Sequence, residues 1–84
     1  MGVPNHPVTL TPEQILELAR KLADLRHNVN NHLSLIVAAT ELMRRRPEAA
    51  ARFVESLADP PNKIAAEVKA FSDQLEKALQ ITLP

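Results

Sequence analysis

The sequence predicts an all-α fold in which a long antiparallel helical hairpin dimerises into a four-helix bundle. The first observation is the composition: one glycine, no tryptophan or tyrosine, and many alanine, leucine, glutamate, lysine and arginine residues, which is typical of helical proteins. The second is that apolar residues recur at alternating steps of three and four, the spacing of helices packed lengthwise. The third is the size: 84 residues without cysteine form a small core and no disulfide, so we expect self-association to stabilise the fold.

The chain divides into a short arm and the hairpin. Residues 1–10 contain two prolines and no apolar period, which predicts an extended, partly mobile N-terminal arm. Residues 11–84 contain the hairpin, with one helix over 12–46 and a second over 48–80. The two helical regions are about 35 residues long and span roughly 50 Å each, so a short turn between them makes an antiparallel hairpin.

The first helix has clear start and stop signals. In "TPEQ", Thr11 is the expected N-cap, Pro12 the first helical residue, and Gln14 the residue that completes a capping box. At the other end, Arg44–Arg46 suit the negative end of the helix dipole, and Pro47 ends the helix.

The apolar residues of this helix form a seam over more than four heptads. The seam consists of Ile15, Leu18, Leu22, Leu25, Val29, His32, Ile36, Ala39 and Met43. Four further apolar residues widen it in the second half: Leu33, Leu35, Val37 and Leu42. Such a wide stripe favours a four-helix bundle over a two-stranded coil, because one neighbouring helix covers only part of it. We therefore expect two hairpins to associate as a homodimer.

The second helix is expected to contain a kink. Pro47 can begin it, whereas Asp59 is a candidate N-cap with Pro60 and Pro61 in the first turn of a new segment. The apolar register nevertheless continues across this break through Ala50, Val54, Leu57, Pro61, Ile64, Val68, Phe71, Leu75 and Ala78. We therefore predict one helix, kinked near Asp59–Pro61, that packs along the first.

A cluster of histidines and asparagines interrupts the first helix in "DLRHNVNNHLSLI". With Ile15 at heptad position a, His27 and Asn31 fall at outward positions, one turn apart on a solvated stripe. That stripe consists of Arg20, Asp24, His27, Asn31, Ser34, Glu41 and Arg45. His32 lies on the seam instead, and we expect it to be hydrogen-bonded to the partner chain.

An exposed imidazole with one free nitrogen is suited to accepting a phosphoryl group. His27 and His32 are five residues apart and so lie on different faces, whereas a zinc pair needs a spacing of three or four. We therefore assign no metal and no cofactor to this cluster.

The segment "LRHNVNNHLSLIVAATELM" resembles the H-box of the dimerisation and histidine-phosphotransfer domain of bacterial sensor histidine kinases. This resemblance implies a dimeric four-helix bundle with His27 as the phosphoacceptor. It implies that Asn31 orients water for the dephosphorylation of a response regulator, and that a receiver domain docks on the outer face of the first helix. Arg20, Asp24 and Ser34, on the same face, are the candidate binding residues.

The sequence departs from the family in two respects. Asn28 stands where the family has an aspartate or glutamate that orients the phosphorylated histidine. The family also continues into an ATP-binding domain, but here the chain stops at Pro84 and its only glycine is Gly2, so it contains no Gly-rich nucleotide loop. We therefore expect that the chain is not a kinase by itself, and we favour a free-standing relative over an excised domain.

Two functions remain open. The first is phosphotransfer or dephosphorylation with a response-regulator receiver through His27. The alternative is a catalytically silent dimeric module that binds a receiver or the bundle of a sensor kinase. The monomeric phosphotransfer type fits less well, because it has a lysine and a glycine soon after its histidine.

The chain has a formal net charge of zero, no apolar run of transmembrane length and no signal peptide. We therefore expect no nucleic acid partner, no membrane partner and a cytoplasmic protein.

Overall fold

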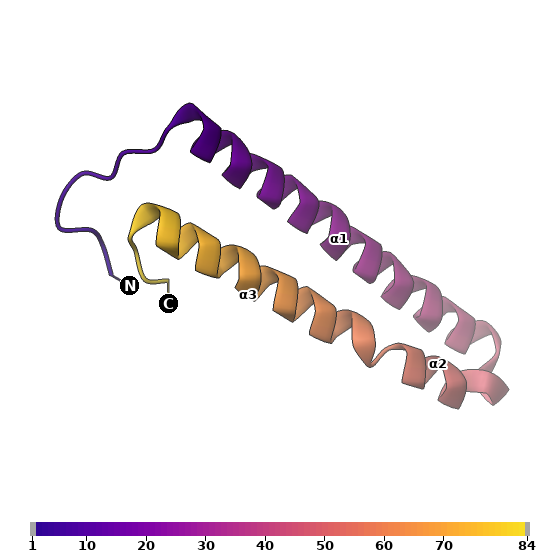
Figure 1. Ribbon diagram of the computed structural model, residues 1–84. Helices are drawn as coiled ribbons and strands as arrows, with labels where there is room; N and C mark the ends of the chain where they lie inside the picture. Colours follow the sequence, from indigo (N-terminus) through magenta and orange to yellow (C-terminus); the bar gives the residue numbers. More distant parts are fainter. Residues whose placement is uncertain (1, 84) are drawn as a thin grey trace.

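The computed structural model describes residues 2–83 and contains an antiparallel helical hairpin (Figure 1). The first arm is α1 (Pro12–Arg45), and the return arm consists of a short 3₁₀ turn η1 (Pro47–Ala49), then α2 (Ala50–Ser56) and α3 (Asp59–Leu79). Figure 1 shows α2 and α3 following each other back along α1. The predicted all-α hairpin is therefore confirmed.

Helix α1 begins with the predicted capping box. The Thr11 hydroxyl accepts a hydrogen bond from the Gln14 backbone N–H at 3.1 Å, and the Gln14 side chain accepts one from the Thr11 N–H at 2.8 Å. The helix ends at Arg45, one residue before the predicted end, and Arg46 donates its N–H to the Leu42 carbonyl at 2.8 Å. Pro47 has no N–H with which to continue the helix, and the chain turns there.

The return arm is two helices instead of one kinked helix: it is interrupted at residues 57–58, just before the predicted kink at Asp59–Pro61, and the cap of α3 also differs from the expectation. Asp59 was the candidate N-cap; this is wrong, because the cap is Ala58, which makes no side-chain capping bond, and Asp59 is already helical. Pro60 and Pro61 occupy the first turn, as predicted. This position tolerates them because the N–H groups of a first turn have no partner within the helix, and Asp59 is still favoured there by the helix dipole.

The two ends of the described chain meet at the open end of the hairpin (Figure 1). Gly2 and Thr82 form an isolated antiparallel bridge, with two backbone hydrogen bonds of 3.0 Å. A Cβ atom at Gly2 would lie only 3.1 Å from the Thr82 hydroxyl oxygen, so a larger residue at position 2 would crowd the bridge. Gln80 adopts a left-handed conformation, with φ of 54°, and turns the chain away from α3 towards this bridge.

The hairpin is a flat layer that is barely thicker than one helix. Its extents are 60 × 24 × 13 Å, whereas a single helix with its side chains is about 10–12 Å across. The radius of gyration is 18.1 Å, compared with about 12 Å for a compact domain of this length. Among the described residues, only Ala39, which is 8% exposed, and Pro60 in the first turn of α3 are buried. The single chain therefore packs one seam and leaves both broad faces open.

No helix in the described part of the chain is long and apolar enough to cross a membrane.

Candidate functional site

His27 lies near the middle of α1, on the side away from the return arm. Leu18, Leu25, His32 and Ala39 are shielded on the packed side. At about 100° per residue, the two-residue step from Leu25 carries His27 to nearly the opposite side of the helix. His27 is accordingly exposed, and a macromolecular partner can approach its ring.

The structure brings His27 and Asn31 together. The Asn31 side-chain nitrogen Nδ2 lies 3.3 Å from His27 Nε2, and both residues are exposed. The four-residue spacing places them on the same face, one turn apart. The site therefore consists of an imidazole nitrogen and an amide that contacts it, with solvent in front of both.

Asn28, which the sequence suggested as the residue beside the reactive histidine, lies on a different side of α1 from His27. Between His27 and Asn28 there is no hydrogen bond among the described residues, because the single-residue step turns Asn28 by about 100° towards the return arm. There it lines a shallow groove of about 190 Å³. The other lining residues are Lys21, Asp24, Leu25, Glu67, Ala70, Phe71 and Gln74.

The three candidate binding residues have different surroundings. Asp24 lines the same groove as Asn28. Ser34 donates its hydroxyl to the Asn30 backbone carbonyl at 2.9 Å, so it is engaged within its own helix. Arg20 is exposed and forms no ion pair with the described residues. These side chains share the His27 side of α1, but the structure does not join them into one network.

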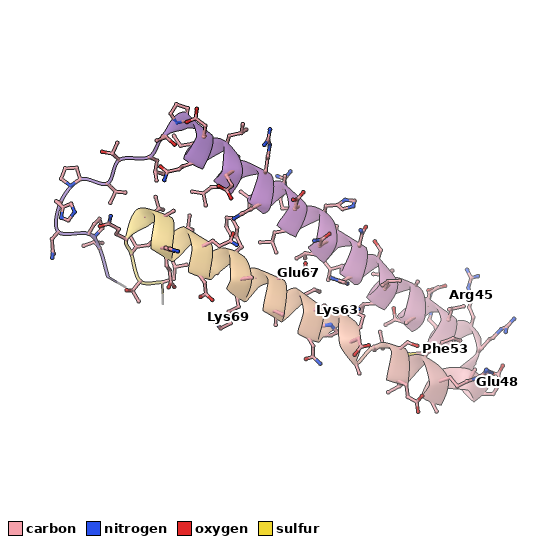
Figure 2. All side chains as sticks on the ribbon, in the orientation of Figure 1. Arg45, Glu48, Phe53, Lys63, Glu67 and Lys69 are labelled. Atoms are coloured by element: carbon pink, nitrogen blue, oxygen red, sulfur yellow. The ribbon has the colours of Figure 1, made fainter. Side chains whose placement is uncertain are left out.

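A polar pair in the seam was missed from the sequence. His32 Nε2 lies 3.5 Å from Glu67 Oε1, so the partner of His32 is in the same chain instead of the expected second chain. Figure 2 shows Glu67 lying between α1 and α3. Its other oxygen, Oε2, is buried without a hydrogen-bond partner among the described residues. The sequence contained a signal for the burial of Glu67, because this residue lies three positions after Ile64 and four before Phe71. That spacing places it on the packed face of the helix.

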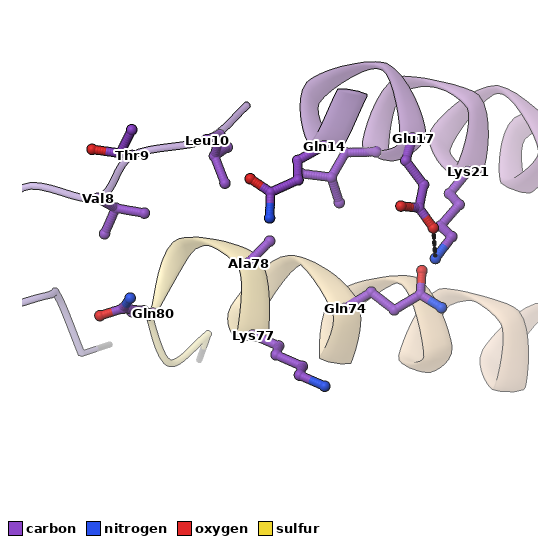
Figure 3. Close-up of a pocket in the computed structure, with 11 residues that line it drawn as sticks. Val8, Thr9, Leu10, Gln14, Glu17, Lys21, Gln74, Lys77, Ala78 and Gln80 are labelled. Carbon is purple, nitrogen blue, oxygen red and sulfur yellow. Dashed lines mark ion pairs between the residues drawn. The ribbon is translucent and has the colours of Figure 1, made fainter. Parts of the chain in front are cut away.

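A larger hollow of about 600 Å³ lies at the open end of the hairpin (Figure 3). The arm contributes Val8, Thr9 and Leu10, and the two long helices contribute most of the other walls. Glu17 and Lys21, which pair at 3.0 Å, are among the lining residues. His27 is not among them, and Lys21 precedes it by six residues, or about 9 Å along the helix axis.

The one described side chain with a clearly shifted pKa is Lys69, on the outer side of α3. Lys69 Nζ lies 2.9 Å from Asp73, and this hydrogen bond, together with the negative charge of Asp73, raises the pKa of Lys69 above its ordinary value of 10.5. Figure 2 shows Lys69 directed away from α1, so this pair does not act on His27. Within the described residues there is no group of three or more histidines or acidic residues that could hold a metal ion.

Comparison of the chain with protein-family models, with curated proteins and with solved structures finds no significant match.

Proposed function

We propose that this chain is a two-component signalling protein that exchanges phosphate with a receiver domain through His27. The observation that carries the proposal is the exposed pair of His27 and Asn31 at the middle of a long helix, with 3.3 Å between the imidazole and the amide. A neutral imidazole offers a lone pair to phosphorus, and an amide can orient a water molecule or donate to a phosphoryl oxygen. Such a partner would place the protein in the cytoplasm.

The proposal includes a homodimeric four-helix bundle, and the exposed area supports it. A folded monomer of this mass is expected to expose about 5,000 Å², whereas the chain of 9.3 kDa exposes 6548 Å². The excess is about 1,500 Å² per chain, which is in the range that obligate homodimers bury on each subunit. This match in area supports a second copy of the chain as the occupant of the open face.

The apolar residues left exposed supply a surface for that second copy. The exposed large apolar side chains lie on more than one side of the hairpin: Leu35 and Leu42 are rotated from Leu25 in one sense, and a larger group is rotated in the other. The larger group, each member between 44% and 65% exposed, consists of Ile15, Leu22, Leu33, Val37, Val54 and Val68. Viewed down the axis of α1, the side chains of this group that lie on α1 point about 60–120° away from the direction of the packed Leu25, all in the same sense. On α3, Val68 points away from the packed Phe71 in that same sense. Because the helices are antiparallel, the same sense of rotation leads to the same broad face of the hairpin. We call these six residues the apolar face.

The oligomeric state has a direct test. Sedimentation equilibrium at micromolar concentration should give twice the chain mass of 9.3 kDa. A monomer under these conditions would contradict the bundle.

The test of function is phosphate exchange with receiver domains. The purified protein is mixed with phosphorylated receivers from the same genome, and label is followed on both proteins, with His27→Ala as the control. We expect label on the wild-type chain and none on the variant. Loss of label from the receiver without transfer would indicate a phosphatase that depends on Asn31, and Asn31→Ala should then abolish it.

One observation favours a second candidate, a silent interaction module. Asn28 lines the groove, and no carboxylate contacts the His27 ring among the described residues, so the charge that would assist phosphorylation is missing. The module would bind a receiver or a sensor kinase without chemistry. His27→Ala should then leave binding to the partner unchanged, whereas it abolishes phosphate exchange in the first case.

A further inference from the structure

We propose that Asn31 regulates His27 by covering its nucleophilic nitrogen with the side-chain amide. This inference rests on the proposed function and concerns the same site. Nδ2 of Asn31 lies 3.3 Å from His27 Nε2, one turn along the exposed side of α1. We call this arrangement the amide cap.

The amide cap favours one of the two neutral tautomers of the His27 imidazole. An amide nitrogen can only donate a hydrogen bond, so the Nε2 atom that it contacts must be the acceptor. In a neutral imidazole one nitrogen is protonated and the other is not, so the proton is on Nδ1. The amide cap thus favours the tautomer of His27 with its lone pair on Nε2, directed at the amide of Asn31.

Other neighbours on the helix do not compete for the ring. Ala23, Asp24 and Asn30 are the remaining residues within one turn of His27 on its side of α1. Asp24 lines the groove and Asn30 lines a separate hollow beside Leu33, and no hydrogen bond joins either side chain to the His27 ring among the described residues. Among the described residues, the hydrogen bond with Asn31 is the one that the His27 imidazole forms.

The cap must open before phosphate can be transferred. In the transfer, the Nε2 lone pair forms the N–P bond while the P–O bond of the receiver's aspartyl phosphate breaks, and that electron pair leaves on the aspartate carboxylate. The proton on Nδ1 stays in place. While Asn31 donates to Nε2, the lone pair is occupied, so attack requires the amide to rotate away. After transfer, the same N–H groups are placed to donate to a phosphoryl oxygen. A partner that draws Asn31 away would thus activate His27.

Nitrogen chemical shifts of the imidazole test the cap without any activity measurement. The ¹⁵N-labelled protein is recorded at about pH 8.5, where imidazoles are neutral, for the wild type, Asn31→Ala and Asn31→Asp. We expect His27 to be protonated on Nδ1 in the wild type. In the isosteric Asn31→Asp variant the carboxylate accepts instead of donating, so the proton should move to Nε2. Asn31→Ala should give a mixture. His6, in the arm, should be unchanged in all three.

Chemical phosphorylation with phosphoramidate tests the consequence for reactivity. In this reaction the Nε2 lone pair forms the N–P bond as the P–N bond of phosphoramidate breaks and ammonia leaves. Asn31→Ala should be labelled at His27 about two- to tenfold faster than the wild type, because the net strength of one hydrogen bond corresponds to that range. His27→Ala supplies the background from the other two histidines.

The outcomes separate this inference from the proposed function. A wild-type His27 protonated on Nε2, or equal labelling rates in the wild type and Asn31→Ala, would overturn the amide cap even if a receiver exchanges phosphate with the protein. The expected tautomers and rates, combined with no exchange with any receiver, would support the cap and contradict the proposed function.

Discussion

His27 and His32 show how strongly the helix period separates neighbouring residues. Five residues turn the helix by about 500°, so the two imidazoles point in directions about 140° apart. His27 is exposed and contacts an amide, whereas the His32 side chain is only 16% exposed and faces a carboxylate on α3. The first is open to a reaction partner, and the second contributes to packing.

The pair of His32 and Glu67 should be coupled energetically. His32→Leu leaves the half-buried Glu67 carboxylate without its partner, and we expect the free energy of unfolding to fall by about 1–2 kcal/mol. The double variant with Glu67→Leu removes both polar groups and should recover most of that loss. Urea unfolding of the wild type, both single variants and the double variant measures the coupling. Additive effects of the two substitutions would show that the pair does not interact.

At the scale of the elements, a side-chain cap defines the start of α1 but not the starts of α2 and α3. Thr11 and Gln14 satisfy each other's backbone N–H groups at the start of α1. Neither α2 nor α3 has a side-chain capping bond, and both begin at a point where a proline or a turn interrupts the chain. The start of α1 is therefore the most firmly specified helix end in the described chain.

Thr11→Ala should lower the free energy of unfolding by about 1 kcal/mol, because it removes the acceptor for the Gln14 N–H. Thr9→Ala is the matched control, since Thr9 lies in the arm and makes no side-chain hydrogen bond among the described residues. Thermal unfolding followed by circular dichroism compares the two. Equal changes in both variants would mean that the capping box does not stabilise α1.

At the scale of the whole molecule, the hairpin is too thin to have a core of its own. A layer 13 Å thick has no interior, and its side chains are shielded only along the line where α1 meets the return arm. The apolar face then lies in water unless another layer covers it, which is unfavourable for so large an area. Stability and assembly are therefore expected to be coupled, so that folding depends on protein concentration.

A charge placed on the apolar face and a charge placed in the seam should have different effects. The first tests packing between two chains, and the second tests packing of α1 against the return arm. Val37→Asp, on the apolar face, should shift the proposed dimer to monomer, because the second copy would have to bury an unpaired carboxylate. Leu25→Asp, in the seam, should also reduce helicity, because it disrupts the hairpin itself. Sedimentation and circular dichroism distinguish the two effects.

Val3→Asp is the control for this experiment. Val3 is 75% exposed but lies in the arm, so this substitution should alter neither mass nor helicity. An unchanged dimer in Val37→Asp would show that the apolar face is not the interface.

Much of the fold followed from local signals in the sequence. The capping box at Thr11, the stop at Pro47 and the break before Pro60 were all predicted, because they depend on backbone chemistry within one or two turns. The exposure of His27 and its proximity to Asn31 were also predictable, since a helix places residues four apart on one face. The cap at Asp59 was wrongly predicted, because Ala58 already has helical backbone angles.

The sequence by itself thus determined the helices, their order and which side of α1 carries the histidine, because these features follow from the helix period and from side chains close together in the chain. Tertiary structure alone decided that Glu67 meets His32, that Asn28 enters the groove and that Gly2 pairs with Thr82. These contacts join residues far apart in sequence, and they depend on how the return arm is rotated and aligned against α1. That alignment is set by the packing of the whole seam, which no single stretch of the sequence encodes.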